Sequence, residues 1–267
     1  MRIPIPASLH LPTAATTPAA PRDAATIALV RDGEKGLETY LLRRRSTLEF
    51  APGVLVFPGG GVHEADREMT RWIGPEPAVW AARFGCDEAT ARGLVVAAVR
   101  ETYEESGILF ASGTGGEPIL DDMASMVDER RALDRRELDF GAFLEAHGLS
   151  IRADLLGAWA HWVTPAFEPK RFDTRFFVAA VPAGQETGDL PGEADRAAWW
   201  PIVDIWPELE SGSSMMLPPT SVTCGELEGM TVAELPAAVA ARSFRRIEPR
   251  LVEDDGQLFL DYSLELP

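Results

Sequence analysis

Three glutamates lie close together in the segment RETYEESG, residues 100–107. On an α-helix, Glu101, Glu104 and Glu105 would occupy positions i, i+3 and i+4, which share one face. The spacing therefore predicts a single patch of three carboxylates on one side of a helix.

Such a patch is costly if it serves structure alone. Like charges at this spacing destabilise a helix by about 0.2–0.5 kcal/mol per pair. Gly107 is a helix-stop signal, so the carboxylates lie in the last turns, where the helix dipole disfavours each anion by a further ~0.3–1 kcal/mol. Carboxylate oxygens are the ligands that Mg²⁺ and Mn²⁺ prefer, and a bound cation removes both penalties. The pattern favours a divalent-metal site, and the alternative is a solvated acidic helix face.

A second segment, GVLVFPGGG at residues 53–61, is a short β-branched and aromatic run that ends in Pro-Gly-Gly-Gly. Backbone without side chains can lie against a helix N-terminus or present N–H groups to an anion. We therefore include Gly59 and Gly60 among the candidate substrate-binding residues, with a simple tight turn as the alternative.

The elements that must position these segments alternate between strand and helix patterns, which predicts an α/β protein with a mixed sheet. The central helix is expected over residues 90–106, with Val95, Val99 and Tyr103 facing a sheet. Ala97 and Ala98 are expected to flank the acidic face and leave it open. Strands are expected at residues 24–30, 37–42, 54–57, 158–163, 176–181 and 197–200, loops at 46–53 and 112–118, helices within 64–92, 120–149, 201–209 and 219–241, and a hairpin over 247–265 that turns at 254–256.

The charge, the cysteine count and the apolar runs of the sequence argue against several classes of protein. The 267 residues carry a formal net charge of −17, which argues against binding nucleic acid or an anionic membrane. Two cysteines cannot build a disulfide framework, and their scarcity fits a reducing compartment. The longest apolar run, residues 94–99, is far shorter than the ~18 residues of a membrane span. We expect a cytoplasmic protein with a small-molecule partner, and nothing in the composition argues against a homodimer.

Residues 1–22 are rich in Pro, Ala and Thr and show no periodicity, so they are expected to form a flexible tail. Residues 23–267 are expected to form a single domain.

Together the two segments resemble the Nudix box, G-x5-E-x7-R-E-U-x-E-E-x-G-U, in which U is bulky and apolar. Gly60 matches the first glycine, and Asp66 takes the acidic position. The second half of the motif matches at Arg100, Glu101, Glu104, Glu105, Gly107 and Ile108. On this basis the chain is identified as a member of the Nudix hydrolase family, and the resemblance implies an α/β/α sandwich with a mixed sheet.

The match departs from the usual motif at two places. Between Asp66 and Arg100 lie 33 residues, which indicates a helical insertion over residues 67–92 within the box. Thr102 stands where an apolar residue is usual. The interrupted box resembles the branch of the family that contains the mammalian peroxisomal coenzyme A diphosphatase. The coenzyme A signature of related enzymes is only partly present, because Arg43 replaces its usual Thr and its internal Arg falls near Phe50.

Nudix enzymes cleave a diphosphate linked to another moiety by attack of water at phosphorus. The resemblance implies that Glu101, Glu104 and Glu105 hold Mg²⁺ or Mn²⁺, with Glu104 a shared ligand or catalytic base. It assigns Arg100 the task of orienting a box carboxylate. A plain i,i+4 ion pair with Glu104 is the alternative.

Further candidates lie outside the box. A polyphosphate substrate needs cations, and guanidinium donates two parallel hydrogen bonds to phosphate, so we select Arg45 and Arg175 for substrate binding. The extra acidic ligand or base has four candidates, of which Glu193 is the first choice. The wider cationic set is Arg43, Arg44, Arg45, Lys170, Arg171 and Arg175, and the acidic set is Glu168, Asp173, Glu193 and Asp195.

Three functional readings follow. The first is a metal-dependent diphosphatase of coenzyme A or acyl-coenzyme A, and the second is the same chemistry on ADP-ribose, NADH or a nucleoside-diphosphate sugar. The third is a non-catalytic nucleotide-binding module, whose usual mark is loss of the box glutamates. The insertion's aromatic residues, Trp72, Trp80 and Phe84, have two readings, a lid or acyl groove and the core of an inserted helical pair.

Overall fold

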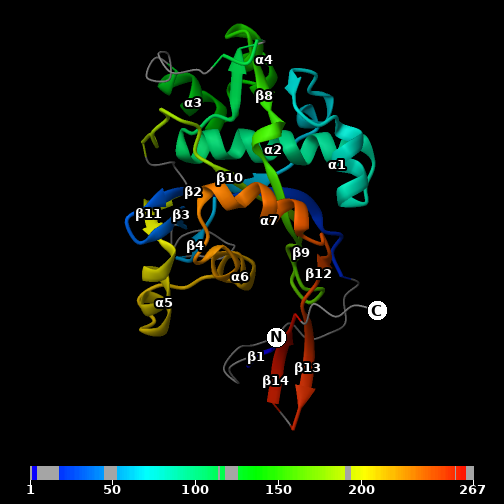
Figure 1. Ribbon diagram of the computed structural model, residues 1–267. Coiled ribbons are helices and arrows are strands. Elements are labelled where there is room, and N and C mark those ends of the chain that lie inside the picture. The colour runs from blue at the N-terminus through cyan, green and yellow to red at the C-terminus, as the bar shows by residue number, and fades with distance from the viewer. Residues whose placement is uncertain are drawn as a thin grey trace.

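An eight-stranded mixed sheet forms the centre of the molecule (Figure 1). The computed structural model describes residues 2–4, 18–44, 53–113, 115–117, 126–189, 194–255 and 257–262. The main strand order is β11-β3-β2-β10-β9-β12, with β4 beside β3 and β5 beside β2. β2 runs parallel to β10 and antiparallel to β3 and β5. The strands are β2 (Arg22–Gly33), β3 (Gly36–Arg44), β4 (Leu55–Val56), β5 (Gly59–Gly61), β9 (Gly157–Val163), β10 (Phe172–Ala180), β11 (Ala194–Pro201) and β12 (Arg246–Ile247).

Helices cover both faces of this sheet. On one face, α1 (Pro77–Phe84) and α2 (Glu88–Ser106) pack over β2 and β10 around Ile27 and Phe177. On the other, α5 (Ile202–Glu210), α6 (Pro218–Leu227) and α7 (Leu235–Ala241) pack around Leu41 and Trp159. The predicted α/β/α sandwich with a mixed sheet is confirmed.

α2 begins and ends where its sequence has capping residues. The Asp87 side chain accepts a hydrogen bond from the Thr90 backbone N–H at 2.8 Å, which caps the first turn. At the other end, Gly107 has φ 80°, and its N–H donates to the Tyr103 carbonyl. A Cβ atom at Gly107 would also lie 2.9 Å from the backbone nitrogen of Gly188, so only glycine fits this helix end.

A fourth layer lies on the far side of α2 (Figure 1). There Tyr103 stacks on Phe143 with ring centroids 5.3 Å apart. The expectation that Ala97 and Ala98 leave the acidic face open is wrong, because both are fully buried between the layers. This layer consists of β6 (Trp72–Ile73), β7 (Ala111–Gly113), β8 (Leu149–Arg152), η2 (Ala153–Leu155), α3 (Val127–Asp134) and α4 (Phe140–Ala146).

The insertion expected over residues 67–92 forms the end of η1 (Ala65–Glu68), β6, α1 and the start of α2. In α1, Trp80 and Phe84 are buried, and the ring centroid of each lies 5.7 Å from that of Phe177. This packing favours the core reading of these aromatic residues over the lid reading.

The C-terminal region differs from the sequence prediction in detail. The stretch expected to be helical over 219–241 is broken into α6, η3 (Val232–Glu234) and α7. Gly229, at φ 78°, follows α6, and Thr231 with Glu234 forms a capping box that starts η3. The expected hairpin is present as β13 (Arg250–Asp254) and β14 (Gln257–Asp261).

The N-terminal segment and one loop also differ. Arg2–Pro4 forms β1, which pairs with β14, although a flexible tail was expected there; residues 5–17 lie outside the described part of the chain. The loop expected over 112–118 begins within β7. Among the described residues, no helix is both long enough and apolar enough to cross a bilayer.

Candidate active site

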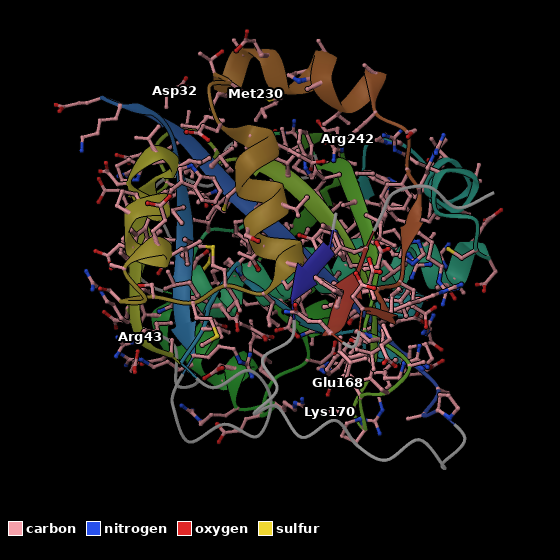
Figure 2. The ribbon with its side chains drawn as sticks, turned by 90° about the horizontal axis from the view of Figure 1, so that it is seen from below. Asp32, Arg43, Glu168, Lys170, Met230 and Arg242 are labelled. Carbon is pink, nitrogen blue, oxygen red and sulfur yellow. The ribbon has the colours of Figure 1, made fainter. Side chains whose placement is uncertain are left out.

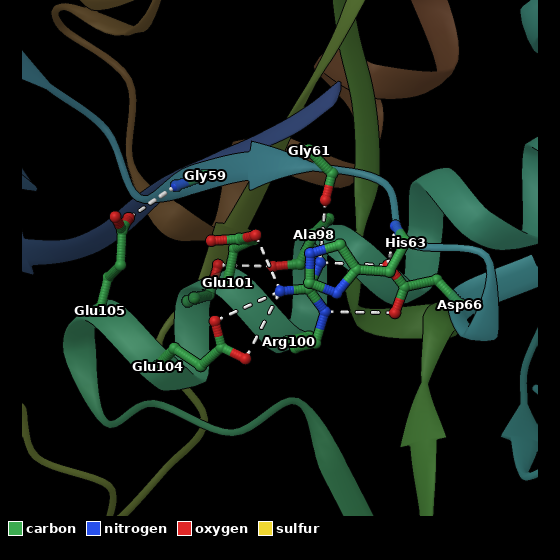
Figure 3. A network of polar contacts seen from close by, with 10 residues as sticks. Gly59, Gly61, His63, Asp66, Ala98, Arg100, Glu101, Glu104 and Glu105 are labelled. Atoms are coloured by element: carbon green, nitrogen blue, oxygen red, sulfur yellow. Dashed lines mark hydrogen bonds and ion pairs between the residues drawn. The ribbon is translucent and has the colours of Figure 1, made fainter. Parts of the chain in front are cut away.

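Arg100 is the centre of a buried polar network (Figure 3). Its side chain is 4% exposed, and it donates five hydrogen bonds to acceptors within 3.2 Å. Nη1 donates to Glu101 at 2.8 Å and to Glu104 at 3.2 Å, and Nη2 donates to the Gly61 carbonyl at 2.9 Å. Nε and Nη2 also contact the two oxygens of Asp66, at 3.2 and 3.1 Å. A guanidinium has five N–H donors, so this one is saturated.

The network joins two parts of the chain that the insertion separates. Asp66 lies in η1 and Arg100 in α2, with 33 residues between them, yet both side chains are 4% exposed where they meet. Asp66 also accepts the backbone N–H of His63 at 2.8 Å. The i,i+4 pair with Glu104 is thus only one of the contacts that Arg100 makes. The two halves of the motif meet although the insertion lies between them in the sequence.

The glycine run lies against the C-terminal half of α2. Gly59 donates its backbone N–H to Glu105 Oε2 at 2.8 Å (Figure 3). A Cβ atom at Gly60 would lie 2.4 Å from the Glu101 carboxylate. The run forms β5 paired with β2, so it is a strand and does not lie at a helix N-terminus. Gly60 is therefore required for Glu101 to approach the sheet.

Burial changes the titration of this cluster. Burial, together with the charge of Glu101, raises the pKa of Glu104 to about 7 despite the opposing charge of Arg100. Burial disfavours the charged form of Arg100, but Glu101 and Asp66 outweigh it and raise the Arg100 pKa above its usual range. Burial and the charge of Arg100 lower the pKa of His63.

The three glutamates lie along the same side of α2, as the spacing predicts, but their carboxylates have different partners (Figure 3). Arg100 binds Glu101 and Glu104, whereas Glu105 accepts from Gly59. Within the described ranges, no group of three or more His, Cys, Asp or Glu side chains is close enough to hold a metal ion.

A cavity of about 220 Å³ borders the network on its Glu104 side, next to the turn between α3 and α4. Arg136 lines this cavity, is exposed and has φ 58°, a left-handed conformation that is strained for a non-glycine residue. Sequence reasoning missed Arg136, because nothing in the residue pattern marks an arginine that ends a helix in this conformation.

The candidates outside the box are dispersed. Arg43 pairs with Asp195 at 2.8 Å on the surface, and in Figure 2 it lies at a different edge of the molecule from Glu168 and Lys170. Arg175 and Asp173 line another cavity, together with His161. The described residues do not include Arg45 or Glu193.

A crystal structure of a Nudix hydrolase from Alicyclobacillus acidocaldarius has 32% sequence identity to this chain and a TM-score of 0.65, and the match covers 84% of this chain and 97% of that one. The chain belongs to the Nudix hydrolase family. The acyl-coenzyme A diphosphatase NUDT19 of Xenopus laevis is 23% identical over 218 residues, which is 68% of this chain. A Caenorhabditis elegans relative, also named for the Nudix hydrolases, is 29% identical over 199 residues. The chain spans 57% of the length of each of these two curated relatives, and no family model matches it.

Thr102 departs from the usual Nudix box, and its environment explains how it is accommodated. It is fully buried, and its hydroxyl donates to the Ala98 carbonyl at 2.8 Å, one turn back in α2. The buried hydroxyl is thus satisfied within the helix, and this position of the Nudix box tolerates a polar residue.

Proposed function

We propose that this Nudix hydrolase is a Mg²⁺- or Mn²⁺-dependent diphosphatase that hydrolyses the diphosphate of coenzyme A or acyl-coenzyme A. The observation that carries the proposal is the carboxylate set of α2, held against β5 by Arg100 and Gly59. The similarity to an acyl-coenzyme A diphosphatase supports this substrate class.

The donor set fits a hard divalent cation by its chemistry, since it consists of carboxylate oxygens beside backbone without side chains. In this proposal Glu101, Glu104 and Glu105 hold the metal. The ion, when bound, supplies charge neutralisation and lowers the pKa of a bound water. Arg100 orients Glu101 and Glu104 through its Nη1 hydrogen bonds, and the backbone N–H of Gly59 orients Glu105.

The cavity on the Glu104 side is the proposed place for part of the substrate. Its lining includes three arginine or histidine side chains, of which Arg100 is saturated by the box. Burial keeps His63 towards its neutral form by lowering its pKa. Among the described lining residues, Arg136 is therefore the cation available to a substrate phosphate in this cavity.

The test is a product-mass assay with Mg²⁺ and with Mn²⁺ on coenzyme A, an acyl-coenzyme A, NADH, ADP-ribose and a nucleotide sugar. We expect the coenzyme A species to be cleaved fastest, and Glu105→Gln to lower kcat by about 10³-fold, of the order seen when a group that stabilises developing charge is removed. Glu88→Gln is the matched control, because Glu88 is exposed in the first turn of the same helix.

Metal binding is checked separately by thermal unfolding. A cation that binds only the folded state raises Tm as its concentration rises, and this rise should be lost in Glu105→Gln but kept in Glu88→Gln. Preferential cleavage of another panel member would discard the coenzyme A assignment and keep the mechanism. A Tm indifferent to millimolar metal, with no turnover, would overturn both.

A further inference from the structure

A second cavity, of about 430 Å³, lies at the edge of the sheet where α1 ends. Its walls come from the C-terminus of α1, from β9 and β10, and from the segment that leads into β12. The charged and titratable side chains that line it are Arg83, Arg175, Arg246, His161 and Asp173, and Phe244 adds an aromatic wall. This concentration of arginine stands out in a chain of net charge −17.

Arg175 is buried there with most of its hydrogen-bonding capacity unused. Its side chain is 6% exposed, and Nη1 donates to Asp173, while Asp23 lies 4.0 Å away. Nε is buried and has no partner, and among the described residues no acceptor is found for Nη2 either. A buried donor without an acceptor costs about 1–3 kcal/mol, so the conformation calls for an acceptor that this part of the chain does not supply.

Arg83, in the last turn of α1, also has an unused donor. Its Nη2 donates to the Val239 carbonyl at 2.9 Å, while its buried Nε has no partner among the described residues. Arg246, 51% exposed at the mouth, pairs with Glu248 at 2.9 Å, and Glu248 is also bound by Arg171 at 2.6 Å.

Among the described residues that line the cavity, Asp173 is the one carboxylate, and its charge is already neutralised. His161 Nε2 lies 2.6 Å from its Oδ1, and Arg175 contacts the same oxygen. Burial acts to raise the pKa of Asp173, but the His161 hydrogen bond and the Arg175 charge hold it below its usual value. Arg246 shares Glu248 with Arg171, so when these two neighbours are counted with the lining, four guanidinium groups face two carboxylates, which leaves a positive excess of two.

We infer that this cavity binds a phosphate dianion, either inorganic phosphate or the phosphomonoester of a small metabolite. A dianion matches the excess charge, and its oxygens can accept from several guanidinium groups at once. A carboxylate carries one charge and is matched by a single arginine.

The cavity is separate from the Nudix box. Arg175 pairs in register with Ala25 of β2, and Ala25 pairs with Gly60 of β5, so one strand lies between the two sites. Ala25 is fully buried beneath α2, and the two cavities share none of the described lining residues. The inference therefore does not depend on which diphosphate the box hydrolyses.

The experiment is isothermal titration calorimetry of the full chain with inorganic phosphate, in EDTA so that no metal-bound phosphate forms at the box. One saturable site is expected, and Arg246→Gln should weaken it at least tenfold, because this exposed residue can be replaced without disturbing the core. Arg175→Gln should abolish it. Arg31→Gln removes one exposed arginine elsewhere, where it pairs with Glu38, and should bind as the wild type does. Glu105→Gln should also bind phosphate normally, even though its kcat is expected to fall.

Parallel titrations with AMP and with adenosine identify the source of the phosphate. Tighter binding of AMP than of inorganic phosphate, with none of adenosine, indicates a phosphomonoester; equal binding indicates the free ion. The inference is overturned if phosphate gives no saturable heat, which would mean that water satisfies the guanidinium donors. Binding that survives in both Arg175→Gln and Arg246→Gln would overturn it as well.

Discussion

Arg100 in α2 and Arg175 in β10 are both buried, yet their surroundings differ. Arg100 makes five hydrogen bonds, to three carboxylates and a carbonyl. Among the described residues, Asp173 alone lies within hydrogen-bonding distance of Arg175, whose Nε has no partner. A saturated buried guanidinium fixes the groups around it, whereas an unsaturated one retains donors for a ligand.

The sharpest test of this contrast replaces each arginine by methionine, which keeps a long apolar side chain. Arg100→Met leaves the buried Asp66 and the partly buried Glu101 and Glu104 without their cation and should lower the free energy of unfolding by about 3–5 kcal/mol. Arg175→Met also removes unsatisfied donors, and Asp173 keeps His161, so the loss should not exceed about 1–2 kcal/mol. Urea unfolding with unchanged m-values is the measurement. Equal losses would show that the two sites do not differ as argued.

A smaller effect tests whether Asp66 ties the insertion to the box. Asp66→Asn weakens two contacts with Arg100 and should cost about 1.5–3 kcal/mol, the range for hydrogen bonds to charged groups. Asp23→Asn is the matched control, because Asp23 bonds Arg67 of the same insertion at 2.7 Å but is 28% exposed. We expect at most about 1 kcal/mol there. A larger loss of stability in Asp23→Asn than in Asp66→Asn would show that the pair of Asp23 with Arg67, and not Asp66, holds the insertion to the rest of the domain.

The sequence predicted the Arg100 region far better than the Arg175 region. Glu101, Glu104 and Glu105 are local on one helix, and spacing alone places them on one side of α2 (Figure 3). The meeting of Asp66 with Arg100 spans 33 residues and was available only through resemblance to a motif. The buried state of Ala97 and Ala98 was missed, because periodicity shows one buried face of a helix and cannot reveal an additional layer that covers its other face.

Arg175 was selected from the sequence as a substrate-binding residue, and that assignment stays a prediction. Its true neighbours come from segments far apart in the chain, namely α1, β9 and residues 244–246. The register of β10 between β2 and β9 sets this meeting, and a strand's register depends on the whole sheet. No local pattern carries that information.

A pH titration probes the carboxylate on the Arg175 side. Because the folded pKa of Asp173 lies below its usual value of about 3.9, its contacts contribute stability above that pH and lose it as pH falls through the folded value. Asp173→Asn should therefore be less stable than wild type by about 1 kcal/mol at pH 7, with the difference shrinking in acid. Asp204→Asn breaks an exposed pair with Lys35 and should show little difference at either pH. A deficit for Asp173→Asn that persists unchanged below pH 3 would contradict the assigned cause.

The smallest expected effect separates stability from activity at Arg136, which lies on the Arg100 side. Arg136 and Asp255 are the two non-glycine residues with positive φ among those described, at 58° and 48°. Replacing either residue by glycine relieves about 1–2 kcal/mol of backbone strain in the folded state. Glycine also makes the unfolded chain more flexible, which offsets about 0.5–1 kcal/mol of this, so the free energy of unfolding should rise by about 0.5 kcal/mol in each variant.

Only Arg136→Gly removes a cation from the cavity beside Glu104, and it should raise KM about tenfold while kcat is retained. Arg136→Lys keeps the charge, so its KM should lie closer to that of the wild type, and it should not show the rise in stability expected for Arg136→Gly. If KM is unchanged in Arg136→Gly, the residue only ends α3, and the substrate phosphate must lie elsewhere along the box.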